Sequence, residues 1–208
     1  MNELAKDLLK IKAVFLSPTK PFTWASGIKS PIYCDNRLTL SYPEIREKIA
    51  RKMAQIIEER FKDCDIVMGT ATAGIPHATL TSYFLNKPCG YVRGKAKDHG
   101  RGNQIEGGYK AKDKVVLIED LISTGGSSLE AIEALRENGL EVLAVISIFT
   151  YGMEKAKNAF KEHNCEAISL VTFDELLKVA TQEKYIAQAD EAKLIKFMQN
   201  PSDESWMN

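Results

Sequence analysis

The chain has 208 residues, and its 28 Lys and Arg residues are balanced by 28 Asp and Glu residues. Hydrophobic residues make up 44% of it and charged residues 27%, which is typical of a globular protein and excludes collagen-like, disordered and coiled-coil classes. The balanced charge excludes a basic field over the whole molecule, so we expect no nucleic-acid partner. This length fits one domain that needs neither disulfides nor a structural metal to fold.

The sequence also limits where the protein works. Apolar segments such as Val142–Phe149 are too short to cross a bilayer, and Met1–Leu4 carries a charge where a signal peptide needs an apolar core. The cysteines, Cys34, Cys64, Cys89 and Cys165, form no CxxC pair, so neither a zinc site nor a redox motif is indicated. We therefore expect a cytoplasmic protein with reduced thiols and no membrane partner.

The first sixty residues contain two predicted helices separated by a loop. Apolar residues at helical spacing predict a helix over Glu3–Val14. Three prolines between residues 18 and 31 then predict a loop with short extended pieces. The pattern Ser41–Glu44 matches a capping box and predicts a helix that continues to about Phe61.

Strands and helices alternate in the middle of the chain. Apolar runs predict strands over Ile66–Gly69, Gly90–Arg93, Val115–Ile118, Val142–Phe149 and Ala167–Val171. Amphipathic segments predict helices over Ile75–Leu85, Ser127–Glu137 and Glu154–His163. A second capping box, Thr172–Glu175, begins the first of two C-terminal helices. This alternation predicts an α/β fold with a mainly parallel sheet flanked by helices.

The two ends of the chain lie outside this alternation. We expect residues 1–40 and 172–208 to pack together as a small hood over a core formed by residues 41–171. The prediction is thus a single domain, 1–208, with a hood built from both termini.

The segment Val115–Ser128 has the pattern of a phosphate-binding loop. A buried strand runs into Glu119 and Asp120, and Gly125 and Gly126 follow just before a helix, where main-chain N–H groups can approach an anion. Ser123, Thr124 and Ser127 add hydroxyl groups. The two acids would accept hydrogen bonds from sugar hydroxyls or hold a divalent metal; the alternative is that they cap the following turn.

A second polar segment, Arg93–Gly102, combines four Lys or Arg residues and one His with three glycines. It is either a solvated hairpin loop or a mobile lid that closes over an anion and excludes water. The neighbouring phosphate loop favours the lid.

The phosphate loop resembles the phosphoribosyl-pyrophosphate (PRPP) signature of the type I phosphoribosyltransferases. In that family the acids contact the ribose hydroxyls and the loop binds the 5-phosphate. The resemblance implies that PRPP is bound by Arg93, Lys95, Lys97, His99, Glu119, Asp120, Leu121, Ile122, Ser123, Thr124, Gly125, Gly126 and Ser127.

Within these enzymes, the lid resembles the flexible loop of the orotate phosphoribosyltransferase family at Arg93, Lys97, His99 and Ile105–Gly107. The resemblance implies a homodimer in which this loop holds pyrophosphate and serves the neighbouring active site.

The segment Phe22–Tyr33 resembles the part of the family's hood that recognises orotate, and Gly69–Ile75 resembles its pyrophosphate loop. The resemblance implies that orotate is bound by Lys29, Tyr33 and Ser123.

Several positions depart from the family pattern. Some relatives carry Lys at Ala25, Ala73 and Gly94, and Arg near Tyr151. Lys95 is expected to compensate for the lysine missing at residue 94. Which group contacts the orotate carboxylate stays open.

The implied reaction joins orotate to PRPP and gives orotidine 5′-monophosphate and pyrophosphate, a step in UMP synthesis. Lys97, His99 and Asp120 are the expected catalytic residues. Mg²⁺ is the expected cofactor, held mainly by substrate and water rather than by a protein metal site. Two alternatives remain, a phosphoribosyltransferase for another base and a non-catalytic regulator that senses PRPP. We expect structural roles for His77 and His163.

Overall fold

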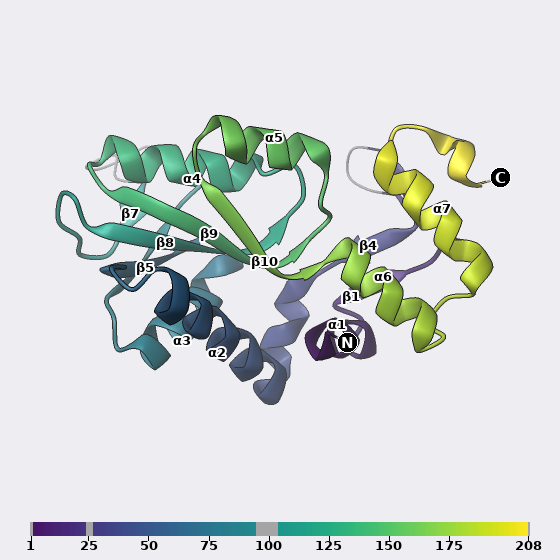
Figure 1. The fold of residues 1–208 in the computed structure, drawn as a ribbon, viewed down its shortest axis with the longest axis horizontal. Coiled ribbons are helices and arrows are strands. Elements are labelled where there is room, and N and C mark those ends of the chain that lie inside the picture. Colours follow the sequence, from purple (N-terminus) through teal and green to yellow (C-terminus); the bar gives the residue numbers. More distant parts are fainter. Residues whose placement is uncertain (1, 24–26, 95–103, 208) are drawn as a thin grey trace.

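The computed structural model describes residues 2–23, 27–94 and 104–207. Its centre is a six-stranded sheet with the order β10-β9-β8-β5-β6-β7 (Figure 1). The strands are β5 (Ile66–Thr70), β6 (Cys89–Val92), β7 (Ile105–Glu106), β8 (Lys114–Ile122), β9 (Glu141–Thr150) and β10 (Glu166–Thr172). All neighbouring pairs are parallel except β6 and β7. The predicted α/β class is confirmed.

Helices cover both faces of this sheet (Figure 1). Helices α2 (Pro43–Arg60) and α3 (Gly74–Leu85) lie on one face, and α4 (Gly126–Glu137) and α5 (Glu154–Glu162) lie on the other. Side chains of β8 alternate between two apolar clusters, Val116 and Ile118 in one and Val115 and Leu117 in the other. This alternation follows from the twofold period of a strand and places the core on both sides of the sheet.

The remaining elements come from the two ends of the chain. They are α1 (Glu3–Lys10), β1 (Val14–Leu16), β2 (Phe22–Thr23), β3 (Lys29–Ser30), β4 (Ile32–Cys34), the 3-10 helix η1 (Asn36–Ser41), α6 (Phe173–Gln182), α7 (Gln188–Gln199) and the 3-10 helix η2 (Glu204–Met207). Strand β1 pairs with β4, and β2 pairs with β3, both antiparallel. Helix α1 packs against α6, which brings the two ends of the chain side by side (Figure 1).

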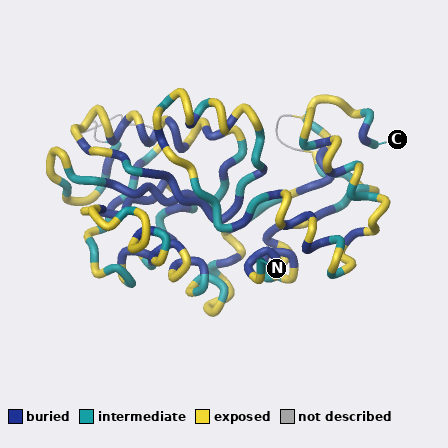
Figure 2. Tube along the Cα trace, viewed as in Figure 1, coloured by how far each residue is buried: buried dark blue, intermediate teal, exposed yellow. Residues whose placement is uncertain are grey.

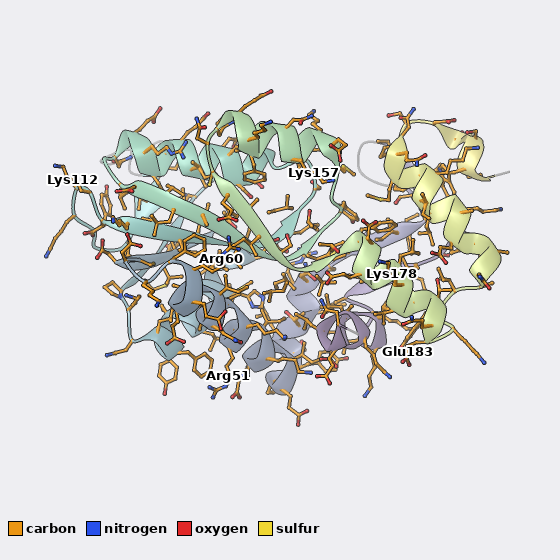
Figure 3. All side chains as sticks on the ribbon, in the orientation of Figure 1. Arg51, Arg60, Lys112, Lys157, Lys178 and Glu183 are labelled. Atoms are coloured by element: carbon orange, nitrogen blue, oxygen red, sulfur yellow. The ribbon has the colours of Figure 1, made fainter. Side chains whose placement is uncertain are left out.

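The buried segments run continuously from the sheet into these terminal elements (Figure 2). Leu4, Leu8, Phe197 and Trp206 from the ends belong to the same apolar cluster as Ile118 of β8. Charged side chains point outward over the rest of the surface (Figure 3). None of the helices in the described part of the chain is long and apolar enough to span a bilayer.

The predicted strands and helices are present, with differences at their ends. The first helix stops at Lys10 rather than Val14, because Lys12 adopts a positive φ of 59° and Val14 already belongs to β1. Strand β8 is longer than predicted, so Glu119 and Asp120 lie within it.

Only one of the two predicted capping boxes forms. Helix α2 is N-capped by Tyr42 without a side-chain hydrogen bond and begins at Pro43, so the box at Ser41–Glu44 is wrong. Pro43 starts this helix instead, because its fixed φ suits the first helical position. The box at the start of α6 is confirmed, since the Thr172 hydroxyl and the Glu175 carboxylate bond to each other's main-chain N–H groups.

Candidate active site

The phosphate-loop segment forms a tight turn between β8 and α4. Gly125 N-caps α4 with a φ of +84°, and a Cβ placed there would lie 3.0 Å from the ring of Phe160. An L side chain is strained at that φ, so the turn favours glycine. Gly125 has no side chain that could cap the helix, and the first N–H groups of a helix have no acceptor within it. The start of α4 can therefore donate several hydrogen bonds to an anion.

Glu119 is 5% exposed and its carboxylate is surrounded by hydroxyl groups. Its Oε1 accepts from Thr70 Oγ1 at 2.7 Å, and its Oε2 accepts from Ser128 Oγ at 3.0 Å and Ser127 Oγ at 3.5 Å. These bonds join the end of β5 to the first turn of α4. Through these bonds, the Glu119 side chain holds the end of β5 and the start of α4 together.

Asp120 is the more accessible of the two acids, since it is half-buried. Burial, and then the neighbouring Glu119, raise the pKa of Asp120 to about 7. Its main-chain N–H donates to Glu119 Oε1 at 3.0 Å, and its carbonyl accepts from Asn36 Nδ2 at 2.7 Å. The two neighbouring acids therefore differ in environment, since one is buried among hydroxyls and the other is half-buried beside it.

The loop between β5 and α3 lies directly against this strand. A Cβ added to Gly74 would lie 2.5 Å from the main-chain oxygen of Ile118, which shows how closely the start of α3 approaches β8. Ala71 N donates to Val92 O at 2.7 Å, and Arg93 follows at the end of β6. Because parallel strands end at the same edge of a sheet, the segments after β5, β6 and β8 meet there.

Arg93 is held beside this edge. Its N–H donates to Gln104 O at 2.8 Å, and its guanidinium lies 3.7 Å from the carboxylate of Glu106.

The hood residues expected to bind the base lie on two short hairpin strands. Tyr33 on β4 is 43% exposed, and its ring packs against Phe22 with centroids 5.6 Å apart. Lys29 Nζ donates to Thr23 Oγ1 at 2.8 Å. Both side chains are exposed and supported by a neighbour, as a recognition surface requires.

Electrostatic effects connect the hood with the end of β8. The Asp35 carboxylate, and to a smaller extent Tyr33 and Asp120, raise the pKa of Arg37. Burial raises the pKa of Tyr151, with smaller effects from Cys34 and Tyr33. Tyr33 therefore lies within electrostatic range of both Arg37 and Tyr151.

A groove of about 1160 Å³ separates the hood from the sheet. Ile28 of the hood, Ile122 and Thr124 of the turn, and Tyr151 after β9 line one part of it. The rest of its wall comes from β9, α5, β10, α6, α7 and the segment that follows α7. Glu119, Asp120, Tyr33 and Lys29 are not among the residues that line this groove, so it adjoins the phosphate turn only at Ile122 and Thr124.

The structure thus brings together the acids of β8, the turn, the loop after β5, and the start of the lid. Of the turn residues, Thr124, Gly126 and Ser127 are exposed and Ser123 is half-buried. Ile122 is 3% exposed, so its main chain is the part that can meet a ligand. Lys95, Lys97 and His99 lie outside the described residues.

Sequence reasoning missed Asn36 at this site, and it did not predict that Thr70, in the segment resembling a pyrophosphate loop, contacts Glu119. Asn36 contacts Asp120, and Thr70 contacts Glu119, although each pair is far apart in sequence. The polar run Asp35–Arg37 directly after a short strand was a signal for the first contact.

Comparisons with known proteins identify the family. Residues 40–177 match the model of the phosphoribosyl transferase domain. The chain is 56% identical over 205 residues to an orotate phosphoribosyltransferase of Listeria innocua, covering 99% of this chain and 97% of that relative. It is 56% identical over 206 residues to the orotate phosphoribosyltransferase of Bacillus pumilus, with the same coverage.

A solved structure agrees. The orotate phosphoribosyltransferase of Aeropyrum pernix superposes with a TM-score of 0.76 at 29% identity, covering 88% of this chain and 99% of that one. The chain therefore belongs to the orotate phosphoribosyltransferase family, whose enzymes act in pyrimidine biosynthesis.

Proposed function

We propose that this site transfers the phosphoribosyl group of PRPP to orotate, giving orotidine 5′-monophosphate and pyrophosphate. The observation that carries the proposal is the course of β8, which leads Glu119 and Asp120 directly into the Gly125 turn at the uncapped start of α4. Such a turn can donate hydrogen bonds to a phosphate. The acids a few residues before it can accept hydrogen bonds from the hydroxyls of the attached sugar.

The 5-phosphate of PRPP lies, in this proposal, against Ser123–Ser127, and the ribose hydroxyls donate to Asp120. Glu119 supports this arrangement by holding Thr70 and Ser128. The main chain of Leu121 and Ile122, which leads into the turn, also contacts PRPP. Arg93 and the lid residues Lys95, Lys97 and His99 hold the pyrophosphate.

Orotate stacks on the exposed ring of Tyr33 and contacts Lys29 and Ser123. Bond cleavage at C1 of the ribose passes through an oxocarbenium-like state, so holding both substrates in line provides much of the rate. Lys97 stabilises charge on the departing pyrophosphate, and His99 supplies a proton to it. Asp120 stabilises the positive charge that develops on the ribose.

Mg²⁺ fits the donor set of this site. Magnesium binds through one or two carboxylates with phosphate and water oxygens, and Asp120 is a half-buried carboxylate beside the phosphate turn. In the described ranges, no three His, Cys, Asp or Glu side chains are grouped as a metal site. Asp120 would hold the ion, directly or through water. When bound, the ion would neutralise the pyrophosphate charge.

We also propose a homodimer in which the lid of one subunit serves the other. Tyr83 on α3 is 77% exposed, Tyr42 is 44% exposed and Leu38 on η1 is 40% exposed. Helix α2, which Tyr42 caps, packs against both α3 and η1. Exposed aromatic residues on adjoining elements are typical of a subunit interface.

Two further proposals concern the whole chain. The ends, 1–40 and 172–208, act as a hood over the groove, and the chain works as a single domain, supported by the continuous apolar cluster from Leu4 to Trp206. The protein works in the cytoplasm, supported by four cysteines that form no disulfide.

The direct test follows the ultraviolet absorbance of orotate in the presence of the protein, PRPP and Mg²⁺. We expect a decline in absorbance that requires all components. In parallel assays with uracil or hypoxanthine in place of orotate, we expect no release of pyrophosphate. Pyrophosphate release with another base would contradict the assignment of the hood, and PRPP binding without turnover of any base would favour a sensor.

A further inference from the structure

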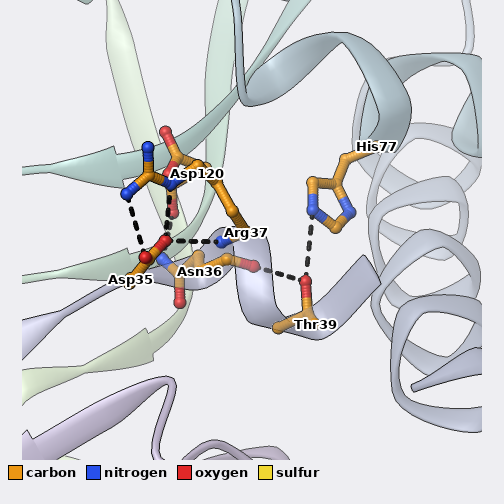
Figure 4. A network of polar contacts seen from close by, with 6 residues as sticks. All are labelled: Asp35, Asn36, Arg37, Thr39, His77 and Asp120. Carbon is orange, nitrogen blue, oxygen red and sulfur yellow. Dashed lines mark hydrogen bonds and ion pairs between the residues drawn. The ribbon is translucent and has the colours of Figure 1, made fainter. Parts of the chain in front are cut away.

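The 3-10 helix η1 lies between the end of β8 and helix α3, and it carries two buried polar side chains towards them (Figure 4). Asn36 is 1% exposed and Thr39 is fully buried. Neither residue belongs to the proposed substrate contacts. Their burial calls for an explanation, because a polar side chain in the interior is costly unless its hydrogen bonds are made.

Asn36 donates a hydrogen bond to a main-chain carbonyl of β8 that has no partner on β5. The pairing of β5 with β8 ends at Gly69 and Ile118, so no β5 residue is paired with Asp120. Carbonyls two residues apart in a strand point to the same edge. At that edge, Thr70 Oγ1 donates to Ile118 O at 3.3 Å, and Asn36 Nδ2 donates to Asp120 O at 2.7 Å.

Both main-chain groups of Asp120 are therefore bonded by side chains. Glu119 accepts from its N–H and Asn36 donates to its carbonyl. A strand end held in this way depends on those two side chains for its conformation. The contact joins residues 84 positions apart and ties the N-terminal segment to the sheet.

A second contact extends from η1 to helix α3. Thr39 Oγ1 donates to Asn36 O at 2.6 Å and lies 3.4 Å from His77 Nε2 (Figure 4). The single hydroxyl hydrogen is used on Asn36, so His77 donates through Nε2. Burial lowers the pKa of His77 to about 4, which leaves the ring neutral near pH 7. The neutral ring needs no counter-charge at this buried position.

Helix α3 begins directly after the loop that resembles a pyrophosphate-binding segment. The chain of contacts from Asp120 through Asn36 and Thr39 to His77 therefore spans both PRPP-binding segments. The Oδ1 atom of Asn36 is buried and has no hydrogen-bond partner among the described residues. Stability alone does not account for an asparagine with one unsatisfied oxygen at this position, since such an atom is destabilising.

We propose that Asn36 is a positioning residue, which holds the Asp120 main chain and keeps it at a set distance from the pyrophosphate loop through Thr39 and His77. This inference rests on the proposed role of Asp120 in PRPP binding. Asn36 itself touches no substrate. Its effect is to keep the ribose-binding carboxylate in place before PRPP arrives, so its loss weakens PRPP binding and leaves the hood contacts to orotate intact.

The test compares Asn36→Ala and Asn36→Leu with the wild type, by steady-state kinetics for each substrate and by calorimetric titration with PRPP and Mg²⁺. We expect KM and Kd for PRPP to rise about tenfold in both variants, as for the loss of one well-placed hydrogen bond, with KM for orotate within about twofold. The side chain in Asn36→Leu is similar in shape to asparagine and lacks the unsatisfied oxygen. A loss of PRPP affinity in this variant is therefore not explained by a loss of folding stability.

Thr81→Val is the matched control. Thr81 is a fully buried polar residue of α3 that contacts Met53 rather than the site. We expect unchanged KM values for both substrates. Thr39→Val, which breaks the link one step further away, should raise KM for PRPP by a smaller factor.

Two results would overturn the inference. One is a PRPP affinity in Asn36→Leu equal to that of the wild type. The other is an equal loss for both substrates that follows the fraction of unfolded protein. Asp120→Asn, measured in parallel, separates this inference from the proposed function: if that variant binds PRPP normally, the assignment of Asp120 itself fails.

Discussion

At the scale of single residues, two neighbouring acids of β8 have opposite surroundings. The Glu119 carboxylate accepts hydrogen bonds from Thr70 and Ser128, whereas that of Asp120 is partly buried next to another acid. Environment rather than residue type therefore separates their roles. Burial, and then the neighbouring Glu119, raise the pKa of Asp120 to about 7. In the proposed complex, Mg²⁺ or a ribose hydroxyl would favour the ionised form, so we expect substrate binding and ionisation to be coupled.

The raised pKa of Asp120 predicts how stability depends on pH. The folded state binds the proton more tightly than the unfolded state, so the free energy of unfolding falls as pH rises from about 4 to about 7. Asp120→Asn removes this loss. The quantity to compare is the Tm of Asp120→Asn minus the Tm of the wild type. We expect this difference to be larger at pH 8 than at pH 4, by at least ~2 °C.

Thermal unfolding at both pH values checks this expectation. Glu58→Gln, which changes an exposed carboxylate on α2, is the control and should show no such trend. An equal Tm difference between Asp120→Asn and the wild type at pH 4 and pH 8 would show that the pKa of Asp120 is the same in the folded and unfolded states.

At the scale of elements, short terminal segments are held by a few specific contacts. Helix α1 has eight residues, too few to be stable alone. Asn2 caps it by accepting from the N–H groups of Leu4 and Ala5, and its amide donates to Leu170 O on β10 at 2.9 Å. One side chain therefore both starts the helix and attaches it to the edge of the sheet.

Loss of this cap should destabilise the protein. We expect Asn2→Ala to lower the free energy of unfolding by about 1–2 kcal/mol, or Tm by roughly 2–8 °C, because it removes the cap and the bond to β10. Differential scanning fluorimetry measures the change, with Lys10→Ala at the exposed end of the same helix as control. A Tm equal to that of the wild type would mean that water replaces the cap at no cost.

At the scale of the whole molecule, the proposed site lies between the end of the sheet and a hood that we propose is made from both ends of the chain. In this proposal, the sheet supplies the acids and the phosphate turn, and the hood supplies Tyr33 and Lys29. In the proposed dimer, the lid of one subunit completes the site of the other. Each active site then needs two chains.

Mixing two inactive variants tests this arrangement. We expect Lys97→Ala and Asp120→Asn to be nearly inactive alone, since one lacks a lid cation and the other an acid of β8. Random exchange of subunits makes about half of the dimers mixed, each with one intact site, so activity should return to about a quarter of the wild type. Activity in the mixture no greater than the average of the parents, with exchange verified by mass spectrometry, would place the lid in its own subunit's site.

The sequence by itself determined the alternation of strands and helices, the turn at Gly125 and its acids, because these follow from local periodicity and turn chemistry. It also carried the family resemblance that the comparisons confirmed. Only the tertiary structure decided that the first helix ends at Lys10 and that α2 starts at Pro43 without a capping box, since neighbouring elements compete for those residues. The contact between Asn36 and Asp120 likewise depends on how η1 docks against the sheet, which no local pattern specifies.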